Sequence, residues 1–576
     1  MHIPATHVLE GASVSSALDR FDWQDRVFAD RPRLSELLAI RPSWPVRRLH
    51  CRVHRNAPFE HVANAARPFL AYAGYEIEYE YSDYDDSFSS PAAGTADLEV
   101  VWVDYTRYRG VQLPADLAEW LGGRIARIRQ ESVAPILLDL WDSDEADAGE
   151  ANARLRDLAA GVPGLHLCDV GKIHRQLGYA FSDARMAGVS GWIMSAAATL
   201  MIAQRFGLVW LPSAVEPRIK AVVLDLDDTL YDGVIGEDGV AGVSISEDHW
   251  RLHAELVRLA SEGVFLAVAS KNDSRDVDEL LATRPEFGIS PADLSGVIVG
   301  WDSKATAIAR LCASLHIAAD AMLLVDDNPG ELASVASSHP GIRLLRAGRP
   351  ADTLRALQIF PGLAGYPSSE TDALRRADAQ AAAERTGDLE SSLDPVEYIR
   401  SLRIQLTFVL NPPGQVRRLH ELSTKTNQFN TGLLRLTEAE VAGRLASPSH
   451  ATAAVRLRDR LSDSGIIAAL FATVQGSTLK VDEVDISCRA LGRGVEDVMI
   501  AEAACRIATE SGCRMVSFRF ADGPRNEPAR AWLKRLPAAI RRRSGEELEV
   551  AVQVDRLAQV ARGPLPIEIV WDPVDP

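Results

Sequence analysis

Short apolar runs alternate with stretches of helical spacing between residues 46 and 215. The runs have the length of buried strands and lie at 98–103, 135–140 and 164–169, and the helical stretches lie at 114–131 and 150–161. This alternation predicts a doubly wound, flavodoxin-like α/β domain with a parallel sheet. The preceding residues, 1–45, repeat apolar side chains at rough helical spacing, which predicts a helical lead-in.

The same alternation continues between residues 216 and 360. Three apolar runs begin at Ala221, Val264 and Met322, and a helical stretch lies between the first two. The segments after the first and second runs are too short to fold as a separate cap over the strand ends. We therefore expect a second, Rossmann-like domain whose site is open to a substrate presented by a macromolecule.

The pattern changes after residue 360. Residues 361–393 are polar and rich in alanine and charge, which is typical of a linker or a connecting helix. From 394 to 576, strands are mixed with helices in an α+β order, with strands expected at 403–410, 452–459, 465–475 and 478–488 and helices at 416–422 and 495–511. The predicted fold class is therefore α/β, in a chain of three domains.

The composition of the chain limits the binding partners and the cellular compartment that we expect for it. A chain of 576 residues is too long for one core, and its formal net charge of -18 argues against a nucleic-acid partner or an anionic membrane. No apolar run is long enough to suggest a membrane span, and the N-terminus does not resemble a signal peptide. The six cysteines form no CxxC pair, so we expect a cytoplasmic protein with free thiols.

The run that begins at Ala221 ends in two carboxylates, Asp225 and Asp227. If the strand stays extended, both lie on one side of it, and like charges this close are costly unless a cation lies between them. Mg²⁺ prefers oxygen ligands and keeps waters that a phosphate can replace. The pattern predicts a magnesium site; the alternative is an acidic turn that closes a buried strand.

Three further stretches carry polar groups in the same order along the chain. They are Ser270-Lys271-Asn272 after the second run, Lys304 in Trp-Asp-Ser-Lys, and Asp326-Asp327-Asn328 after the third run. Open α/β sheets bind their ligands at the carboxyl ends of parallel strands. We therefore expect a nucleophile, phosphate-binding donors and metal ligands to meet at one edge of the sheet.

These four stretches resemble the four motifs of the haloacid dehalogenase (HAD) superfamily of phosphotransferases. The resemblance implies that Asp225 is the nucleophile, Asp227 the general acid/base, and Ser270 and Lys304 the groups that hold the phosphoryl oxygens. It also implies supporting roles for other residues. The implied metal ligands are Asp225, Asp227 through its carbonyl, Asp326 and Asp327, and the implied substrate-binding residues are Thr229, Lys271, Asn272 and Asn328.

The string from Asp225 to Gly239 closely resembles the FkbH-like subgroup of that superfamily. Three positions depart from the subgroup's usual residues, namely Asp228, Tyr231 and Asp232, and Ala269 stands where a Cys is common. The departures concern the fit of the substrate more than the phosphoryl chemistry, because Asp225 and Asp227 are both present.

The C-terminal part carries a strand, the string Arg489-Ala-Leu-Gly492-Arg-Gly494, and then a helix. This order resembles the loop with which acyltransferases of the GNAT fold hold a pantetheine pyrophosphate, and it implies that Arg489, Gly492 and Gly494 bind substrate. Cys488 precedes the loop. It either carries an acyl group as a thiolate or is a small buried strand residue.

The segment 46–215 resembles the SGNH-like domain often fused in front of this phosphatase type. Its first strand holds His50, Cys51 and His54 but is not followed by a Gly-Asp-Ser turn that would expose a nucleophile. We therefore expect a scaffold or docking role. A thiolate pair of Cys51 with one of the histidines is the alternative.

The FkbH-like resemblance implies an enzyme with two activities. It removes phosphate from 1,3-bisphosphoglycerate and loads the glyceryl unit onto the phosphopantetheine thiol of an acyl carrier protein, in polyketide biosynthesis. Two alternatives stay open: a Mg²⁺-dependent phosphatase of another small or carrier-bound substrate, and a non-catalytic scaffold that docks a carrier protein.

Overall fold

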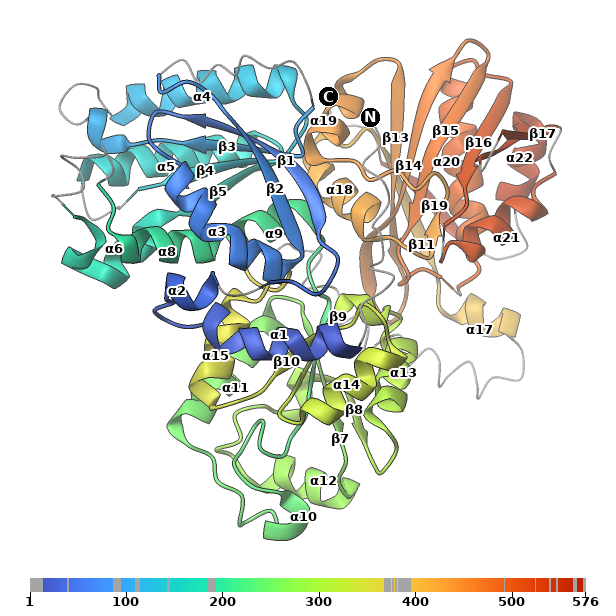
Figure 1. The fold of residues 1–576 in the computed structure, drawn as a ribbon. Coiled ribbons are helices and arrows are strands. Elements are labelled where there is room, and N and C mark those ends of the chain that lie inside the picture. Colours follow the sequence, from blue (N-terminus) through green and yellow to red (C-terminus); the bar gives the residue numbers. More distant parts are fainter. Residues whose placement is uncertain are drawn as a thin grey trace.

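The structure is a computed structural model with three β-sheets, joined by helices (Figure 1). The helices and strands bear out the predicted α/β fold, with two all-parallel sheets. It describes residues 14–38, 41–85, 95–108, 114–141, 146–183, 193–366, 374, 378, 381, 395–491, 493–523, 525–537, 540–544, 547–562 and 567–572.

The first sheet has the strand order β2-β1-β3-β4-β5 and is parallel throughout. Strands β3 and β4 are buried along their whole length, as their unbroken apolar runs predict. The strands are β1 (Arg47–Arg55), β2 (Tyr75–Tyr81), β3 (Leu98–Trp102), β4 (Ile136–Leu140) and β5 (Leu165–Asp169), and the main helices are α3 (Glu60–Ala73), α4 (Pro114–Glu131), α5 (Ala146–Gly161) and α6 (Val170–Leu177).

The second sheet has the order β10-β9-β6-β7-β8 and is also parallel. Its strands are β6 (Ala221–Leu224), β7 (Phe265–Ser270), β8 (Leu294–Val299), β9 (Met322–Asp326) and β10 (Arg343–Arg346), and its helices are α10 (Ile235–Asp238), α11 (Glu247–Ser261), α12 (Ser274–Thr283), α13 (Lys304–Leu315), α14 (Pro329–Ser338) and α15 (Pro350–Ile359). Strands β7 and β8 follow β6 on one side of it, whereas β9 and β10 lie on its other side. The carboxyl ends of β6 and β9 therefore flank a topological switch point, where α/β sheets bind ligands.

The lead-in helix α1 (Val14–Val27) packs on the second sheet, although the first sheet follows it in sequence (Figure 1). The Gln24 side chain donates to the carbonyl of Arg346 and accepts from its N–H at 3.0 Å, which satisfies one residue of the edge strand β10. Trp23 and Phe28 enter a hydrophobic core that continues from the first sheet to the second. The two sheets therefore share one core.

An apolar helical stretch, Ala196–Val215, comprises α8 (Ala196–Arg205), the π-helical turn Phe206–Trp210 and α9 (Leu211–Val215). In the described part of the chain it is the one helix long and apolar enough to cross a membrane, which the sequence analysis overlooked. However, 72% of its most apolar window is buried inside the protein. A Cβ at Gly207 would lie 2.7 Å from the Cβ of Phe69, so this helix touches α3 at van der Waals distance, as a core helix does.

The third sheet is mainly antiparallel, in the order β17-β18-β16-β15-β14-β13-β11-β19. Strands β15 and β16 run parallel and pair over four residues, and beyond that point β12 pairs with β15 instead. The strands are β11 (Gln405–Leu410), β12 (Phe429–Asn430), β13 (His450–Arg458), β14 (Asp463–Gln475), β15 (Thr478–Ile486), β16 (Met515–Ala521), β17 (Ile540–Ser544), β18 (Glu547–Gln553) and β19 (Glu568–Trp571), and the helices are α17 (Pro395–Ser401), α18 (Val416–Lys425), α19 (Glu438–Ala446), α20 (Glu496–Glu510), α21 (Glu527–Arg535) and α22 (Val554–Ala561).

The third sheet meets the amino-terminal edge of the second. Lys220, just before β6, donates to the carbonyl of Lys425 at 3.4 Å, and Asp320, just before β9, pairs with Arg525 at 2.8 Å. Glu438 of α19 accepts from the N–H of Gly164 in the first domain. The carboxyl-terminal edge of the second sheet, marked by α10 and α12, points away from both neighbours (Figure 1).

Replacing Gln24 with Leu should lower the free energy of unfolding by about 1–3 kcal/mol, because the N–H and carbonyl of Arg346 lose their partners. Urea unfolding followed by tryptophan fluorescence measures the change. The matched control is Asp22→Leu at an exposed position of the same helix, for which we expect a change within about 0.5 kcal/mol. Equal losses in both variants would show that the amide contacts do not contribute.

Candidate functional site

The predicted site residues of the central part gather at the carboxyl ends of β6, β7 and β9. Strand β6 ends at Leu224, earlier than the sequence pattern suggested, so Asp225 and Asp227 lie beyond the strand and not on one side of an extended segment. The N–H of Asp225 still bonds to the carbonyl of Val325 at 3.0 Å, and this contact fixes Asp225 beside β9. The chain then turns through Asp228, which has a φ of 49°.

Three carboxylates form a compact group at this edge. Asp225, Asp326 and Asp327 each offer an oxygen atom, and these atoms lie within 4.8 Å of one another. Asp225 and Asp326 are buried, and Asp327 is half-buried. A group of closely spaced, largely buried oxygen ligands suits a hard cation such as Mg²⁺. The donor set therefore fits the implied metal.

The electrostatics of the group favour a cation. Burial raises the pKa of Asp225 to about 7; Lys304 opposes the rise and Asp326 adds to it. Burial, reinforced by Asp326, also raises the pKa of Asp327. The ionised forms of two adjacent, buried carboxyl groups are unfavourable because of burial and mutual repulsion. A cation bound between them would offset both effects.

Lys304 is the first residue of α13, a helix capped by the Ser303 side chain. Its ammonium donates to Asp225 at 2.9 Å and also contacts Asp326. Burial would lower the pKa of Lys304, but the two carboxylates outweigh burial and raise it. Lys304 therefore stays charged and lies where it can neutralise a phosphoryl group held at Asp225.

Asp227 lies beside this group and is held by three donors. Its Oδ1 accepts from the Tyr231 hydroxyl at 2.7 Å and from the N–H of Ile235 at 3.1 Å, and its Oδ2 accepts from the Asn272 amide at 2.9 Å. Tyr231 is fully buried. The sequence analysis treated Tyr231 only as a departure from a family pattern; its spacing of four residues from Asp227 was the available signal.

The second strand supplies a hydroxyl and an amide. Ser270 ends β7, is buried, and its Oγ accepts from Asn272 at 2.9 Å. Asn272 therefore links Ser270 to Asp227. Thr229 is 2% exposed, and its hydroxyl oxygen has no hydrogen-bond partner in the structure. A buried hydroxyl of this kind can satisfy a ligand oxygen at the site.

Two residues expected to bind substrate have structural partners. Lys271 pairs with Glu331 of α14 at 2.5 Å. The Asn328 side chain caps α14 by accepting from the N–H of Gly330, and its own N–H donates to Asp326 at 2.9 Å. Asn328 thus orients a carboxylate of the group rather than pointing its amide at a ligand.

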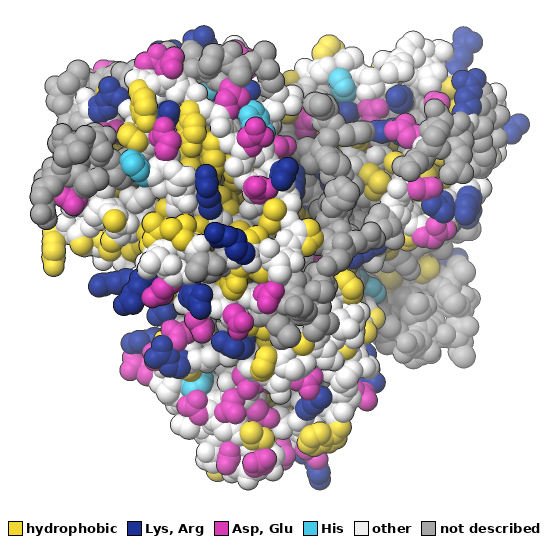
Figure 2. All heavy atoms as spheres, viewed as in Figure 1, with side chains coloured by type: hydrophobic (Ala, Val, Ile, Leu, Met, Phe, Trp, Pro, Cys, Tyr) yellow, Lys and Arg dark blue, Asp and Glu magenta, His cyan; other side chains and the backbone are white. Residues whose placement is uncertain are grey.

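No separate domain covers this edge among the described residues of the central part. The loop after β6 holds only α10, one helical turn, and Trp301 near Lys304 is 78% exposed. Asp228, Asp232 and Glu237 in the same loop are exposed, and acidic side chains gather over this end of the molecule (Figure 2). The site is open, with an acidic rim.

The proposed pantetheine loop follows β15. Gly494 has a φ of 68°, a value that favours glycine, and α20 begins two residues later. Arg489 faces Asp378 of the linker at 3.7 Å rather than an open surface. Cys488 is half-buried with a free thiol, and Gly492 lies outside the described residues.

This loop belongs to the third sheet, whereas the carboxylate group belongs to the second. β15 runs parallel to β16, so the loop leaves the third sheet at the same end as Arg525, which contacts the amino-terminal edge at Asp320. The carboxylates lie beyond the other end of β9. The length of that strand alone separates the two edges by about 15 Å.

In the first domain, the end of β1 is filled. The Asn56 amide accepts from the N–H of Asp104 and donates to the Tyr108 hydroxyl, both at 2.7 Å. Cys51 is fully buried, and burial raises the pKa of its thiol well above the usual value. The thiolate alternative for Cys51 is therefore wrong, and His54 instead contacts Glu99 at 2.9 Å.

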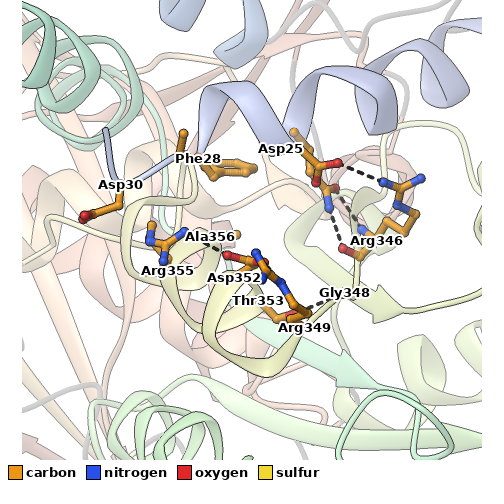
Figure 3. Close-up of a pocket in the computed structure, with 12 residues that line it drawn as sticks. Asp25, Phe28, Asp30, Arg346, Gly348, Arg349, Asp352, Thr353, Arg355 and Ala356 are labelled. Atoms are coloured by element: carbon orange, nitrogen blue, oxygen red, sulfur yellow. Dashed lines mark hydrogen bonds and ion pairs between the residues drawn. The ribbon is translucent and has the colours of Figure 1, made fainter. Parts of the chain in front are cut away.

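A cavity of about 520 Å³ lies between α1 and the start of α15 (Figure 3). Its basic lining residues already have acidic partners. Arg346 contacts Asp25 at 3.4 Å, and Asp352 contacts both other arginines of the lining, Arg349 and Arg355. These ion pairs leave the described lining with no unpaired basic group to select an anion.

Tyr231→Phe should lower kcat for p-nitrophenyl phosphate about tenfold with little change in KM, because one hydrogen bond that positions Asp227 is lost. Steady-state kinetics at saturating Mg²⁺ measures both constants. Tyr179→Phe removes the hydroxyl of a fully exposed tyrosine and is the control. An unchanged kcat would contradict a positioning role for Tyr231.

No protein-family model matches the sequence, and no curated protein is significantly similar to it. Solved structures that resemble parts of the chain include the N-terminal part of protein BF1531 from Bacteroides fragilis, which contains a phosphatase domain complexed with Mg (17% identity, TM-score 0.46, 60% of this chain and 98% of that chain). Two acetyltransferases resemble another part. One is a spermidine N-acetyltransferase SpeG mutant from Vibrio cholerae, with 12% identity and a TM-score of 0.22 over 27% of this chain and 96% of that chain. The other is a GNAT-family acetyltransferase from Streptococcus pneumoniae, with 15% identity and a TM-score of 0.20 over 26% of this chain and 99% of that chain. Values this low assign neither a family nor an activity to this chain.

Proposed function

We propose that this chain is a Mg²⁺-dependent phosphotransferase that works through an aspartyl phosphate at Asp225. The observation that carries the proposal is the group of Asp225, Asp326 and Asp327 with the Lys304 ammonium at the switch point of a parallel sheet. Mg²⁺, when bound by these carboxylates, would supply the positive charge that lets a carboxylate approach a phosphate.

The side chains fit the steps of such a reaction. A carboxylate oxygen of Asp225 forms a bond to phosphorus as the bond to the leaving oxygen breaks, and Lys304 neutralises the phosphoryl charge. Asp227 is held where it can exchange a proton with the leaving group and later with the attacking water. Water then attacks phosphorus, releases inorganic phosphate and restores the Asp225 carboxylate.

We further propose that the substrate is 1,3-bisphosphoglycerate. The phosphopantetheine thiol of an acyl carrier protein attacks its C1 acyl carbon and the C1 phosphate leaves, while Asp225 removes the C3 phosphate, so that the glyceryl unit ends on the thiol as a thioester. The open edge of the second sheet and the loop after β15 support this proposal. The phosphoryl and pantetheine sites would lie on different sheets, so a long flexible arm suits the transfer. Exposed Arg542 on the edge strand β17 offers a basic contact for an acidic carrier.

A second candidate is a phosphatase of another phosphate ester. Tyr231 favours it, because this residue contacts Asp227 and departs from the FkbH-like pattern. The acidic rim of the site also favours it, because acidic side chains repel an acidic carrier protein at this edge. A non-catalytic scaffold would have no use for a buried lysine between two buried carboxylates.

Asp225→Asn should lower phosphate release by roughly a thousandfold or more, because the amide is a poor nucleophile of nearly the same volume. Release of inorganic phosphate measures the effect, and thermal unfolding tests whether the fold is kept. Asp228→Asn, at an exposed acid three residues on, should stay near wild-type activity. Comparable activity of the Asp225 variant would overturn the assignment.

The finer proposal predicts a mass increase of one glyceryl unit on a holo carrier protein incubated with the chain, Mg²⁺ and 1,3-bisphosphoglycerate. Intact-protein mass spectrometry detects the adduct. If Cys488 carries the unit, the chain alone shows a hydroxylamine-labile adduct that Cys488→Ala abolishes. Phosphate release with no loading of the carrier would favour the second candidate.

A further inference from the structure

A carboxylate of the linker is buried in a ring of donors beside the proposed pantetheine loop. The Oδ1 of Asp378 accepts from the Ser462 hydroxyl at 2.6 Å, from the Ser464 hydroxyl at 2.8 Å and from Arg493 at 3.2 Å. Its Oδ2 lies 3.7 Å from Arg489. Asp378 is 1% exposed. Three hydrogen-bond donors and the Arg489 guanidinium therefore converge on one anionic group.

The donors belong to the third domain, and Asp378 comes from outside it. Ser462 lies in the turn between β13 and β14, Ser464 lies at the start of β14, and the two arginines lie between β15 and α20. Of the linker, the structure describes Leu374, Asp378 and Ala381. Asp378 and Ala381 are buried, and a Cβ at Gly465 of β14 would lie 3.2 Å from Leu374, so these residues pack on the third sheet.

The donor set has the chemistry of an oxyanion receptor. Guanidinium and hydroxyl groups bind phosphate and carboxylate oxygens with charge-assisted hydrogen bonds. Burial would raise the pKa of Asp378, but the two arginines and two serines outweigh burial and hold it below the usual value. Asp378 is therefore bound as an anion. Its carboxylate oxygens take the positions that the oxygens of a phosphate would take.

We propose that Arg489, Arg493, Ser462 and Ser464 form an oxyanion-binding site that Asp378 occupies in the free chain. A phosphate group, that of a pantetheine arm, binds there by displacing Asp378. The choice of a pantetheine phosphate rests on the proposed function, whereas the competition with Asp378 does not. Asp378 thus occupies the site until a phosphate-bearing ligand displaces it.

The experiment is a calorimetric titration of the full chain with 4′-phosphopantetheine and, separately, with inorganic phosphate. Asp378→Asn should bind phosphopantetheine about tenfold more tightly than wild type, because a neutral amide competes less well for two arginines. The matched control is Asp463→Asn at the first residue of β14, where the acid pairs with Arg456 instead. The control should bind as wild type does.

Equal or weaker binding by a folded Asp378→Asn variant would overturn the proposal and make Asp378 a plain structural contact. If Asp378→Asn binds inorganic phosphate more tightly than wild type but phosphopantetheine equally well, the oxyanion site is supported and pantetheine is refuted as its ligand. If the variant fails to fold, limited proteolysis of wild type decides. Saturating phosphopantetheine should speed cleavage of the linker 361–393, and unchanged cleavage would refute displacement. Phosphate release at Asp225 plays no part, so a negative result leaves the proposed phosphatase reaction standing.

Discussion

Two buried carboxylates share one buried ammonium at the carboxyl edge of the second sheet. Asp225, Asp326 and Lys304 could not stay buried singly, because an unpaired charge in the interior costs several kcal/mol. Their mutual contacts fix β6, β9 and the start of α13 relative to one another. The carboxylates still outnumber the ammonium once Asp327 is added, so a further cation bound there would lower the repulsion between them.

The two edges of this sheet differ in what they contact. Contacts with the third sheet form at the amino edge through Lys220 and Asp320, so they leave open the carboxyl edge, where the carboxylate group lies. The first domain joins the second by a shared apolar core instead, with α1 lying across the joint. A large common core favours movement of these two units as one body. The contacts to the third sheet are polar, and interfaces of that type allow one unit to move relative to the other.

The other two domains place their polar groups against partners of their own. Asn56 fills the end of β1, and Asp378 fills the ring of donors near Arg489. The strand β12 pairs with β15 where β16 diverges from it. The carboxylate group at Asp225 differs from these two sites. Among the described residues, the one ammonium of Lys304 does not balance the charges of its three carboxylates.

The sequence alone determined the α/β class, the central strands of each sheet, and the strand ends at which carboxylates, a serine and a lysine meet. These follow from local periodicity, and parallel strands bring their carboxyl ends together whatever the loops do. Only the tertiary structure decided that Asp227 is held by Tyr231, that Asn328 caps a helix, and that Arg489 faces Asp378. It also supplied β8 and β10, which the sequence pattern did not predict, and it buried an apolar helix of membrane-spanning length inside the protein. Such contacts join residues far apart in the chain, and their energies depend on burial and on the partner present, neither of which a local pattern encodes.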